Sequence, residues 1–410
     1  MDMDEIEIPQ YFICPISLQI MKDPVTAVTG ITYDRESIEH WLLTAEDSTC
    51  PVTKQPLPRD SDMTPNVTLR RLIQAWCIIN ANNGVDRIPT PKSPLNRSHV
   101  RKLVRDLKVP HLCVNSLKKM EEVANMNEKN RKCMVEAGVT REMVLLIVKC
   151  FKEGKFEGVE EAFRVLHLIW TPNSENKQLV KENFDFIESM RWVLGCDHVG
   201  NHVEVKTHSL LTMKMILEVV SSNVLERLRL DFFKQIVKIL RERTSHDQQV
   251  QKAILHILIE ACPWGRNRMK IIEAGAIFEL IELELDKPEK KVTELIFCLL
   301  AHLCSCADGR EQLLSHAGGV AMVSKRVLRV SPATDDRAIH ILMLISRFCA
   351  THQLLLEMLR VGAVSKLCMV LQADSEKYLK NKARDVLRMH SNVWNNSPCI
   401  AVYLLTMDTR

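Results

Sequence analysis

The sequence predicts a mainly α-helical protein in which a small α+β domain precedes a long α-solenoid. The chain has 13 glycines and 5% aromatic residues, which favours helices because Gly destabilises a helix interior by about 1 kcal/mol relative to Ala. Beyond residue 98 one short phrase recurs, and its glycines Gly275, Gly318 and Gly362 are 43 and 44 residues apart. A chain of 410 residues also exceeds the size of a single core, so more than one folding unit is expected.

The charge balance and the N-terminal sequence exclude several classes of protein. The chain has 55 basic and 51 acidic side chains, which does not predict a nucleic-acid-binding surface. The sequence MDMDEIEIP lacks the features of a secretory signal, and no run reaches the roughly 18 apolar residues of a membrane-spanning helix. We expect an intracellular protein in the cytoplasm, with the nucleus and the membrane periphery as further locations.

The cysteines do not predict a disulfide framework or a metal site. Fourteen cysteines are spread from Cys14 to Cys399 without a CxxC pair. Cys304 and Cys306 form a CxC, but a structural zinc ion needs four ligands. In a reducing compartment most of these residues are expected to be buried thiols.

The first element is a module rich in Pro, Thr and Asp. It opens with a loop over residues 11–18 and continues to a β-hairpin whose turn contains Thr29-Gly30. Asp34 then occupies an N-cap position. A central helix with one apolar face follows, because apolar residues recur at i, i+3 and i+4. These residues are Ile38, Trp41 and Leu42.

A second loop, Cys50-Pro51-Val52-Thr53-Lys54, follows the central helix, and Pro65-Asn66 begins a last amphipathic helix. Two loops around one helix are the layout of a RING domain, which normally needs eight Cys or His ligands for two zinc ions. The module offers Cys14, His40, Cys50 and Cys77, which include no chelating pair. We therefore expect a zinc-free fold held by hydrogen bonds and salt bridges. The candidate residues are Lys22, Asp23, Asp34, Arg35 and Glu36.

The segments IPQYFICPISLQIMKDPVTAVTGITYDRESIEHWL, CPVTKQPL and TPNVTLRRLIQAWC resemble the U-box of plant ubiquitin ligases. In that family the two loops and the central helix bind a ubiquitin-conjugating enzyme. The resemblance implies that the docking residues are Ile16, Leu18, Trp41 and Pro51. It also implies that the scaffold of the module includes Cys14, Asp34, Cys50 and Trp76. Packing in the core is the alternative for the docking residues, most of all for Leu18.

The resemblance implies a mechanism without a nucleophile on this chain, because a substrate lysine attacks the thioester of the charged enzyme. Many relatives have Arg at the position of Lys54, where its planar fork can bridge the enzyme and ubiquitin. Lys54 is a candidate ubiquitin contact, although Lys lacks the bidentate geometry. A catalytic thiolate at Cys14 or Cys50 is the competing chemistry. Neither cysteine has an activating group beside it in sequence.

Residues 81–97 are predicted to link the module, residues 1–80, to the repeat region. The stretch NANNGVDRIPTPKSPLNR is rich in proline and poor in apolar residues. Three Thr-Pro or Ser-Pro dipeptides are minimal proline-directed phosphorylation sites, although ordinary turn chemistry is the simpler explanation of each. Their candidate phosphosites are Thr64, Thr90 and Ser93.

Residues 98–395 form the repeat region and residues 396–410 a C-terminal tail. The recurring phrase is a glycine between small residues, followed by an apolar helix. Its copies lie at Gly138, Gly275, Gly318 and Gly362, with degenerate helix starts near Phe184 and Asp231. We expect this glycine to bend the chain before the long third helix of each repeat. The segments VEAGV, IEAGAI and SHAGGV resemble armadillo repeats, and an irregular helical bundle is the alternative.

Together the two resemblances match the plant U-box armadillo ubiquitin ligases, including members that act in defence and stress responses. They imply a ubiquitin transferase whose partners are a conjugating enzyme, ubiquitin and a substrate protein held by the solenoid, with no cofactor. A non-catalytic adaptor with a degenerate U-box is the alternative, and Lys54 is its sequence hint. A nuclear-transport scaffold is not supported, because Trp170, Trp192 and Trp264 follow no single repeat period. Each Trp is expected in the core.

Overall fold

The computed structural model describes residues 8–44, 49–58, 61–81, 97–196, 202–242, 248–398 and 400–401. The chain divides into two compact units, Met1–Pro94 and Leu95–Arg410, and each is described by itself. Most of the predicted linker, including Thr90 and Ser93, lies outside the described residues. Most of the predicted C-terminal tail lies outside them as well.

The N-terminal unit is built on a small antiparallel sheet with strand order β2-β1-β3. Its elements in chain order are the 3-10 helix η1 (Gln10–Phe12), β1 (Pro24–Thr26), β2 (Thr32–Asp34), α1 (Arg35–Thr44), β3 (Thr64–Pro65) and α2 (Val67–Ile79). The predicted hairpin is confirmed, since Val25 pairs with Tyr33 and Gly30 in the turn has a φ of 78°. Strand β3 was not predicted, because two exposed residues carry no alternating pattern.

Both α-helices of this unit pack an apolar face against the sheet. In α1, Ile38 and Leu42 are buried, as their spacing predicts. Helix α2 begins at the predicted cap, where Asn66 Oδ1 accepts a hydrogen bond from Leu69 N at 3.0 Å. One core results, and its buried residues are Phe12, Cys14, Met21, Val25, Ala27, Tyr33, Ile38, Leu42, Cys50, Leu57, Ile73 and Cys77.

The second unit is an α-solenoid. It begins with α3 (Arg97–Asp106) and α4 (Pro110–Met126). The three-helix repeats that follow are α5 (Glu128–Glu136), α6 (Val139–Glu153) and α7 (Val159–Ile169); α8 (Ser174–Glu182), α9 (Asp185–Leu194) and α10 (His202–Leu217); α11 (Ser222–Glu226), α12 (Leu230–Glu242) and α13 (Gln248–Ala261); α14 (Asn267–Glu273), α15 (Ala276–Leu285) and α16 (Lys290–Leu303); α17 (Ala307–Ser315), α18 (Gly319–Arg326) and α19 (Pro332–Phe348); and α20 (His352–Arg360), α21 (Ala363–Gln372) and α22 (Lys377–Met389). Helix α23 (Ser391–Trp394) comes next.

The recurring glycine marks a different bend from the one expected. Gly138, Gly275 and Gly362 have φ values of 81°, 82° and 78°, and each lies between the first and second helices of its repeat. The prediction that the glycine directly precedes the long third helix was therefore wrong. A left-handed residue suits glycine because it has no Cβ. The degenerate starts near Phe184 and Asp231 are confirmed as the beginnings of the second helices α9 and α12.

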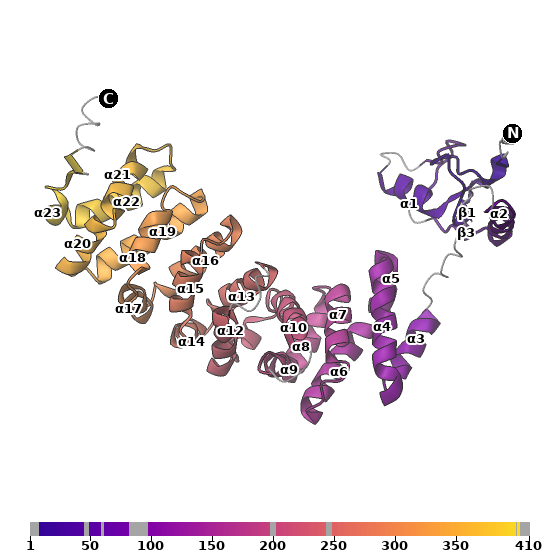
Figure 1. The fold of residues 1–410 in the computed structure, drawn as a ribbon, viewed down its shortest axis with the longest axis horizontal. Helices are drawn as coiled ribbons and strands as arrows, with labels where there is room; N and C mark the ends of the chain where they lie inside the picture. Colours follow the sequence, from indigo (N-terminus) through magenta and orange to yellow (C-terminus); the bar gives the residue numbers. More distant parts are fainter. Residues whose placement is uncertain are drawn as a thin grey trace. The chain divides into compact units, whose positions relative to one another are not determined.

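The third helices form the continuous part of the solenoid. From α4 through α7, α10, α13, α16, α19 and α22, each packs against the next. In Figure 1, α7, α10, α13 and α16 lie along the inner side of the curved unit, and α6, α9 and α12 lie on the outer side. Each third helix buries an apolar stripe and leaves a partly exposed one. We call the partly exposed stripes of these helices the inner surface.

Buried polar side chains join successive repeats, a feature that the sequence pattern did not indicate. Asn130, Asn176 and Asn267 lie near the start of first helices, and Arg310 takes the same place in α17. Each donates to carbonyls near the end of the preceding third helix, as Asn267 Nδ2 does to Ala261 O at 3.2 Å. The last carbonyls of a helix have no partner within it, and the chain just beyond a helix end needs acceptors and donors from elsewhere as well. The side chains therefore act as clamps between repeats.

The tryptophans and cysteines test two further expectations. Trp170 is buried, but Trp264, in the turn before α14, is 41% exposed. The prediction that each solenoid Trp is a core residue was wrong for Trp264. The described cysteines are all free thiols, and each is buried or half-buried. The expectation of buried thiols is thus confirmed for them.

Candidate functional site

Two loops of the N-terminal unit share one backbone frame. Loop 1 (Ile13–Ile20) and loop 2 (Thr49–Pro56) are each closed by an antiparallel bridge between their first and last residues. In both loops the cysteine N–H donates to the glutamine carbonyl at 2.8 Å, and the residue before that glutamine donates to the cysteine carbonyl at 2.9 Å. These residues are Cys14, Leu18 and Gln19 in loop 1 and Cys50, Lys54 and Gln55 in loop 2. The segments CPISLQ and CPVTKQ are therefore a structural repeat on either side of α1.

The residue before each glutamine has a left-handed backbone. Leu18 has a φ of 55° and Lys54 a φ of 59°, a conformation that costs a residue with a Cβ about 1 kcal/mol or more. Leu18 is 76% exposed, and Lys54 is exposed as well. The exposure of Leu18 excludes the core alternative for this residue. The two loops thus hold one apolar and one basic side chain in solvent at matched positions.

Charged groups fasten loop 1. Asp34 Oδ1 accepts hydrogen bonds from Lys22 N and Asp23 N, both at 2.8 Å. The Asp23 carboxylate is itself 2.6 Å from Arg35 Nε and 3.5 Å from Arg70 Nη1. These charge-assisted bonds are the kind of contact expected in place of zinc. The sequence placed Asp34 as the N-cap of α1, whereas these bonds of its carboxylate go to the segment after loop 1.

Hydroxyl and amide groups around the Cys50 sulfur fasten loop 2 to the hairpin. Cys50 Sγ lies 2.9 Å from Tyr33 Oη and 3.4 Å from Thr29 Oγ1, and Thr53 N donates to it at 3.5 Å. Burial by itself raises the pKa of Cys50, but the hydrogen bonds from Thr29, Thr53 and Tyr33 outweigh it and lower the pKa to about 6. Burial and the neighbouring thiol raise the pKa of Tyr33, so its hydroxyl keeps the proton that it donates.

Cys14 has the corresponding place in loop 1. Asp34 N donates to its Sγ at 3.3 Å. Burial opposes ionisation, but hydrogen bonds from Ser17, Asp34 and Ile16 lower its pKa. The sequence showed no activating group for either thiol, and hydrogen bonds from within each loop and from the hairpin take that part. Cys14 and Cys50 are nevertheless both 0% exposed, and a buried sulfur cannot attack a thioester on another protein. Both serve as hydrogen-bond acceptors that hold their loops.

Trp41 connects the central helix to loop 2. Its Nε1 donates to Thr49 O at 3.0 Å, and its ring is half-buried. Trp76 of α2 packs edge-to-face on Phe12, with ring centroids 5.8 Å apart. Trp41 therefore holds loop 2 through a hydrogen bond and remains partly exposed. Trp76 packs against the segment before loop 1.

The structure fastens the two loops and α1 to one another through the hairpin. Ile16 and Pro51 are half-buried, and Leu18 is the most exposed of the proposed docking residues. Sequence reasoning missed Val52, which is 49% exposed and occupies the position in loop 2 that Ile16 has in loop 1. The matching of CPIS with CPVT was the signal that could have identified it. The candidate site comprises the exposed and half-buried apolar side chains of both loops, Trp41 and the exposed Lys54.

Other described parts of the chain offer less chemistry. No group of three or more His, Cys, Asp or Glu residues among the described residues could hold a metal ion. Within the same residues, no helix combines the length and the apolar character needed to span a membrane. Thr64, the candidate phosphosite in β3, is exposed.

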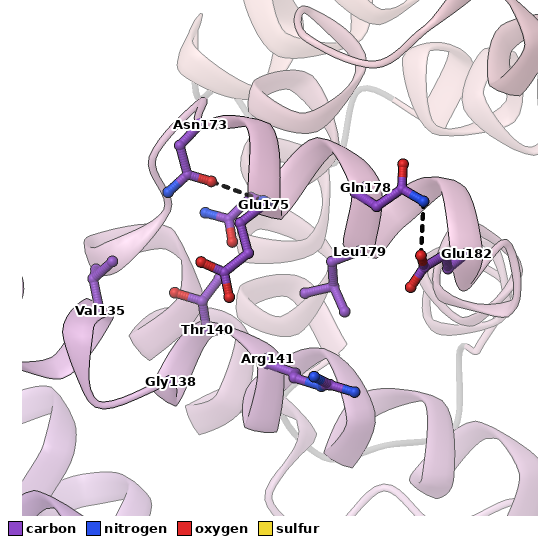
Figure 2. Close-up of a pocket in the computed structure, with 10 residues that line it drawn as sticks. Val135, Gly138, Thr140, Arg141, Asn173, Glu175, Gln178, Leu179 and Glu182 are labelled. Atoms are coloured by element: carbon purple, nitrogen blue, oxygen red, sulfur yellow. Dashed lines mark hydrogen bonds between the residues drawn. The ribbon is translucent and has the colours of Figure 1, made fainter.

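A cavity of about 170 Å³ lies between helix α8 and the bend at Gly138, which joins α5 to α6. Figure 2 shows Thr140, Arg141 and Glu175 around it, with Gln178 directed to Glu182. Gln178 Nε2 donates to Glu182 Oε1 at 2.7 Å, and the lining carries charges of both signs. This small polar recess is a packing feature between two repeats, and it has no apolar chamber for a cofactor.

Family models match both units. The model of the U-box domain matches residues 8–82, and the model of the plant U-box protein ARM repeat region matches residues 99–409. The second match extends through most of residues 396–410, which the sequence reading treated as a separate tail.

Curated relatives match over nearly the whole chain. E3 ubiquitin-protein ligase PUB24 from Arabidopsis thaliana is 42% identical, with 98% of this chain and 96% of the relative covered. E3 ubiquitin-protein ligase PUB23 from the same plant is 42% identical, with 97% and 96% covered. E3 ubiquitin-protein ligase PUB22 is 38% identical, with 97% of each chain covered.

Solved structures with a similar fold are more distant in sequence. An engineered protein aligns with a TM-score of 0.52 at 19% identity, covering 72% of this chain and 68% of its own. A chain from work on a phosphorylation switch in the interaction between cadherin and beta-catenin aligns with a TM-score of 0.60 at 12% identity, covering 78% of this chain and 57% of its own. At these identities the likeness concerns the fold alone.

Proposed function

Because the chain belongs to the plant U-box proteins with an armadillo-repeat region, and is therefore a U-box ubiquitin-protein ligase, we propose how its two units divide the work. Loop 1, loop 2 and α1 dock a ubiquitin-charged conjugating enzyme. The solenoid holds the protein whose lysines receive ubiquitin. Docking on one unit and capture on the other raise the effective concentration of the two reactants.

One observation carries the docking part of this proposal. Leu18 and Val52 are exposed apolar side chains on loops that are held rigidly from behind, and Ile16, Trp41 and Pro51 are half-buried beside them. Aliphatic and aromatic anchors of this kind dominate the free energy of protein interfaces. The hydrogen bonds that hold the loops replace zinc, so the docking surface is formed before the enzyme arrives.

The reaction itself needs no nucleophile on this chain. The substrate lysine amine attacks the thioester carbonyl, an isopeptide bond forms, and the thiol of the conjugating enzyme leaves. The buried sulfurs of Cys14 and Cys50 take no part in these bonds. The ligase contributes orientation, and a favourable pose can lower the barrier by several kcal/mol.

Lys54 is the proposed contact to ubiquitin. It is exposed, has a left-handed backbone and follows Val52 by two residues in loop 2. A Lys ammonium can donate to a carbonyl oxygen but cannot form the parallel pair of bonds that Arg makes. We expect Lys54 to assist transfer less than an Arg would at the same place.

The test is a reconstitution with activating enzyme, conjugating enzyme, ubiquitin, ATP, excess Mg²⁺ and a zinc-selective chelator. Self-ubiquitination by the full chain should resist the chelator. Leu18→Ala should lower the rate on the order of 30-fold, as expected for an interface anchor worth about 2 kcal/mol. Val28→Ala is the matched control, since Val28 is 68% exposed in the same unit but lies outside both loops. Equal rates for the two variants would contradict docking through loop 1.

The biological setting is proposed from the resemblance to ligases of defence and stress responses. We propose that this chain regulates such signalling from the cytoplasm. Plants that lack it should differ from the parent in their response to a pathogen elicitor or to drought, and a fluorescent fusion should show cytoplasmic signal. An unchanged response with a fusion confined to one organelle would contradict both parts.

A further inference from the structure

A row of histidines runs along the inner surface of the solenoid. Each of the third helices α7, α10, α13, α16 and α19 carries a half-buried histidine in its partly exposed stripe. These residues are His167, His208, His256, His302 and His340. Imidazole is the side chain whose charge changes most readily near neutral pH, so the charge of this surface can change in a narrow range.

The two ends of this row differ in their surrounding charge. Near α7, the Arg164 guanidinium contacts three carboxylates, those of Glu121, Glu160 and Glu204. One positive charge therefore faces three negative ones. The carboxylates at this end therefore gather around Arg164, while Lys214 acts on His167, and Arg164 and Glu204 act on His208.

Near α19 and α22 the excess is basic. The Asp336 carboxylate lies 2.6 Å from Lys382 Nζ and 3.3 Å from Arg337 Nη1, so two cations share one acid. Helix α22 itself carries five Lys or Arg residues and one Asp. The Arg268 guanidinium, from α14, is a further cation that acts on His302. The inner surface therefore ends in a cationic region around His302 and His340.

The charged groups that surround these two histidines come from several helices. Those that act on His302 are Arg268 of α14, Arg337 of α19 and His340. Those that act on His340 are Lys382 of α22 together with Asp336 and Arg337 of α19. Further charges on the neighbouring elements are Glu260 of α13, the Lys291–Glu294 pair of α16, and the Glu284–Arg326 pair between α15 and α18. Burial, aided by Arg268 and Arg337, lowers the pKa of His302. Burial and Lys382 do so for His340, although Asp336 opposes them.

We propose that the inner surface of α16, α19 and α22, around His302 and His340, binds an acidic segment of the substrate protein. Charge complementarity selects this occupant, because Arg268, Arg337 and Lys382 outnumber Asp336 among the charged side chains that act on the two imidazoles. The inference rests on the proposed function, in which the solenoid holds the substrate, and it names the class of sequence that is held. A basic segment would meet like charges at this end.

Binding and protonation are coupled at this site. In the free protein the two imidazoles are neutral at neutral pH, because their surroundings disfavour the charged form. A carboxylate placed beside them favours the imidazolium, so an acidic segment binds with uptake of protons. The affinity for acidic segments must therefore increase as pH falls from 8 to 6.

The experiment measures binding of a labelled peptide to the full-length chain by fluorescence anisotropy. The probe has about a dozen residues, half of them Glu and the rest Ser, and a Lys/Ser peptide of equal length is its counterpart. We expect the acidic peptide to bind about tenfold more tightly at pH 6 than at pH 8. His302→Gln/His340→Gln should remove this pH dependence while keeping the affinity at pH 8 within about twofold. Arg337→Gln/Lys382→Gln should weaken binding at both pH values.

The other end of the same row, at His167 and His208, supplies the matched control. His167→Gln/His208→Gln should leave the pH profile of peptide binding unchanged. The proposal is overturned if the parent protein binds the acidic peptide equally at both pH values, if the Lys/Ser peptide binds as tightly, or if the control variant also flattens the profile. Self-ubiquitination assayed on the same preparations tests the proposed function separately from the acidic-segment inference. Its persistence without pH-dependent binding rejects the acidic-segment inference alone, and its absence in the parent rejects the proposed function of the docking unit.

Discussion

Loops 1 and 2 have the same backbone frame but are held by different chemistry. Loop 1 is fastened by charged groups, with Asp34 and Asp23 accepting hydrogen bonds and ion pairs. Loop 2 is fastened by hydroxyls and a thiol, with Tyr33 and Thr29 at Cys50. The comparison teaches that each loop needs a hydrogen-bond acceptor behind it, and that the chemical type of this acceptor can differ. A RING domain uses zinc for the same purpose.

The same comparison holds at the loop tips. The left-handed position is filled by Leu18 in one loop and by Lys54 in the other. The frame fixes where the side chain points, and the residue type decides what it binds. At this position loop 1 presents an apolar side chain and loop 2 presents a cation. One loop can therefore make an apolar contact with the partner and the other an electrostatic contact.

The largest effect should come from Asp34→Ala. The substitution leaves the N–H groups of Lys22 and Asp23 without their acceptor, which should destabilise the N-terminal unit by about 3 kcal/mol or more. Ubiquitin transfer should then be lost. Hydrogen exchange of the segment after loop 1 and a transfer assay measure both effects. Asp62→Ala, which removes an exposed acid of the same unit, is the control, and a stable, active Asp34→Ala protein would show that loop 1 does not depend on charge.

The next effect should come from Leu18→Lys, which gives loop 1 the residue of loop 2. We expect the transfer rate to fall on the order of 30-fold. Docking would bury this apolar anchor, and a Lys in its place carries a charge that must be desolvated. Circular dichroism should show an unchanged fold, since Leu18 is 76% exposed. A rate near that of the parent would mean that the two tips are interchangeable.

Tyr33→Phe removes a donor from loop 2 and leaves loop 1 intact. We expect a loss of stability of about 1 kcal/mol and a higher pKa for Cys50, because one of the bonds that lowers it disappears. Faster hydrogen exchange should be confined to loop 2 and the hairpin. Equally faster exchange in loop 1 would show that the two loops are not fastened independently.

The Cys50 thiol gives loop 2 a pH dependence of definite sign. Its pKa is lowered from 9.0 to about 6 in the folded protein, so between these values the unfolded chain binds more protons. The stability of the unit should rise with pH from about 6 to 9 and lose this contribution as pH falls through 6. Urea unfolding at several pH values measures the slope. In Cys50→Ser the slope should be smaller, with the remainder from Cys14, whose pKa is also lowered, and an unchanged slope would assign it to other groups.

The smallest effect should come from Lys54→Arg. An Arg can form two parallel hydrogen bonds across the interface, so we expect transfer to become a few-fold faster with no change in stability. Single-turnover discharge of the charged conjugating enzyme onto free lysine measures this step. Lys54→Gln is the companion variant, and equal rates for Arg, Lys and Gln would remove Lys54 from the mechanism.

Much of the fold could be predicted from the sequence, because the local signals agreed with the tertiary contacts. The Asn66 cap, the Gly30 turn and the apolar face of α1 each depend on a few neighbouring residues. The position of the repeat glycine was misjudged, because a period in sequence gives the spacing of bends and not the helix that each bend precedes. Strand β3 was missed because its pairing partner is distant in sequence.

The site was predictable in outline and not in its supporting contacts. The docking residues were inferred from resemblance, whereas the thiol acceptors depend on Tyr33, Thr29 and Asp34, which lie many residues from the cysteines that they contact. The left-handed conformation of Leu18 and Lys54 has no local signal, since neither residue favours it. The match of CPISLQ with CPVTKQ aligns these two residues in sequence, and the structure shows that they share this conformation.

The clamps between repeats determine how the solenoid yields to mechanical force. Asn130, Asn176, Asn267 and Arg310 tie their first helices to the preceding third helix, whereas in α11 the asparagine, Asn223, is exposed and the helix has five residues. When stacked repeats are pulled apart, the junction between two repeats that has the fewest bonds separates first. Among the described residues, the junctions of α10 with α11 and of α19 with α20 have no such clamp. An unfolding motor that pulls on either end should therefore extract the solenoid in steps, with pauses when these two junctions part.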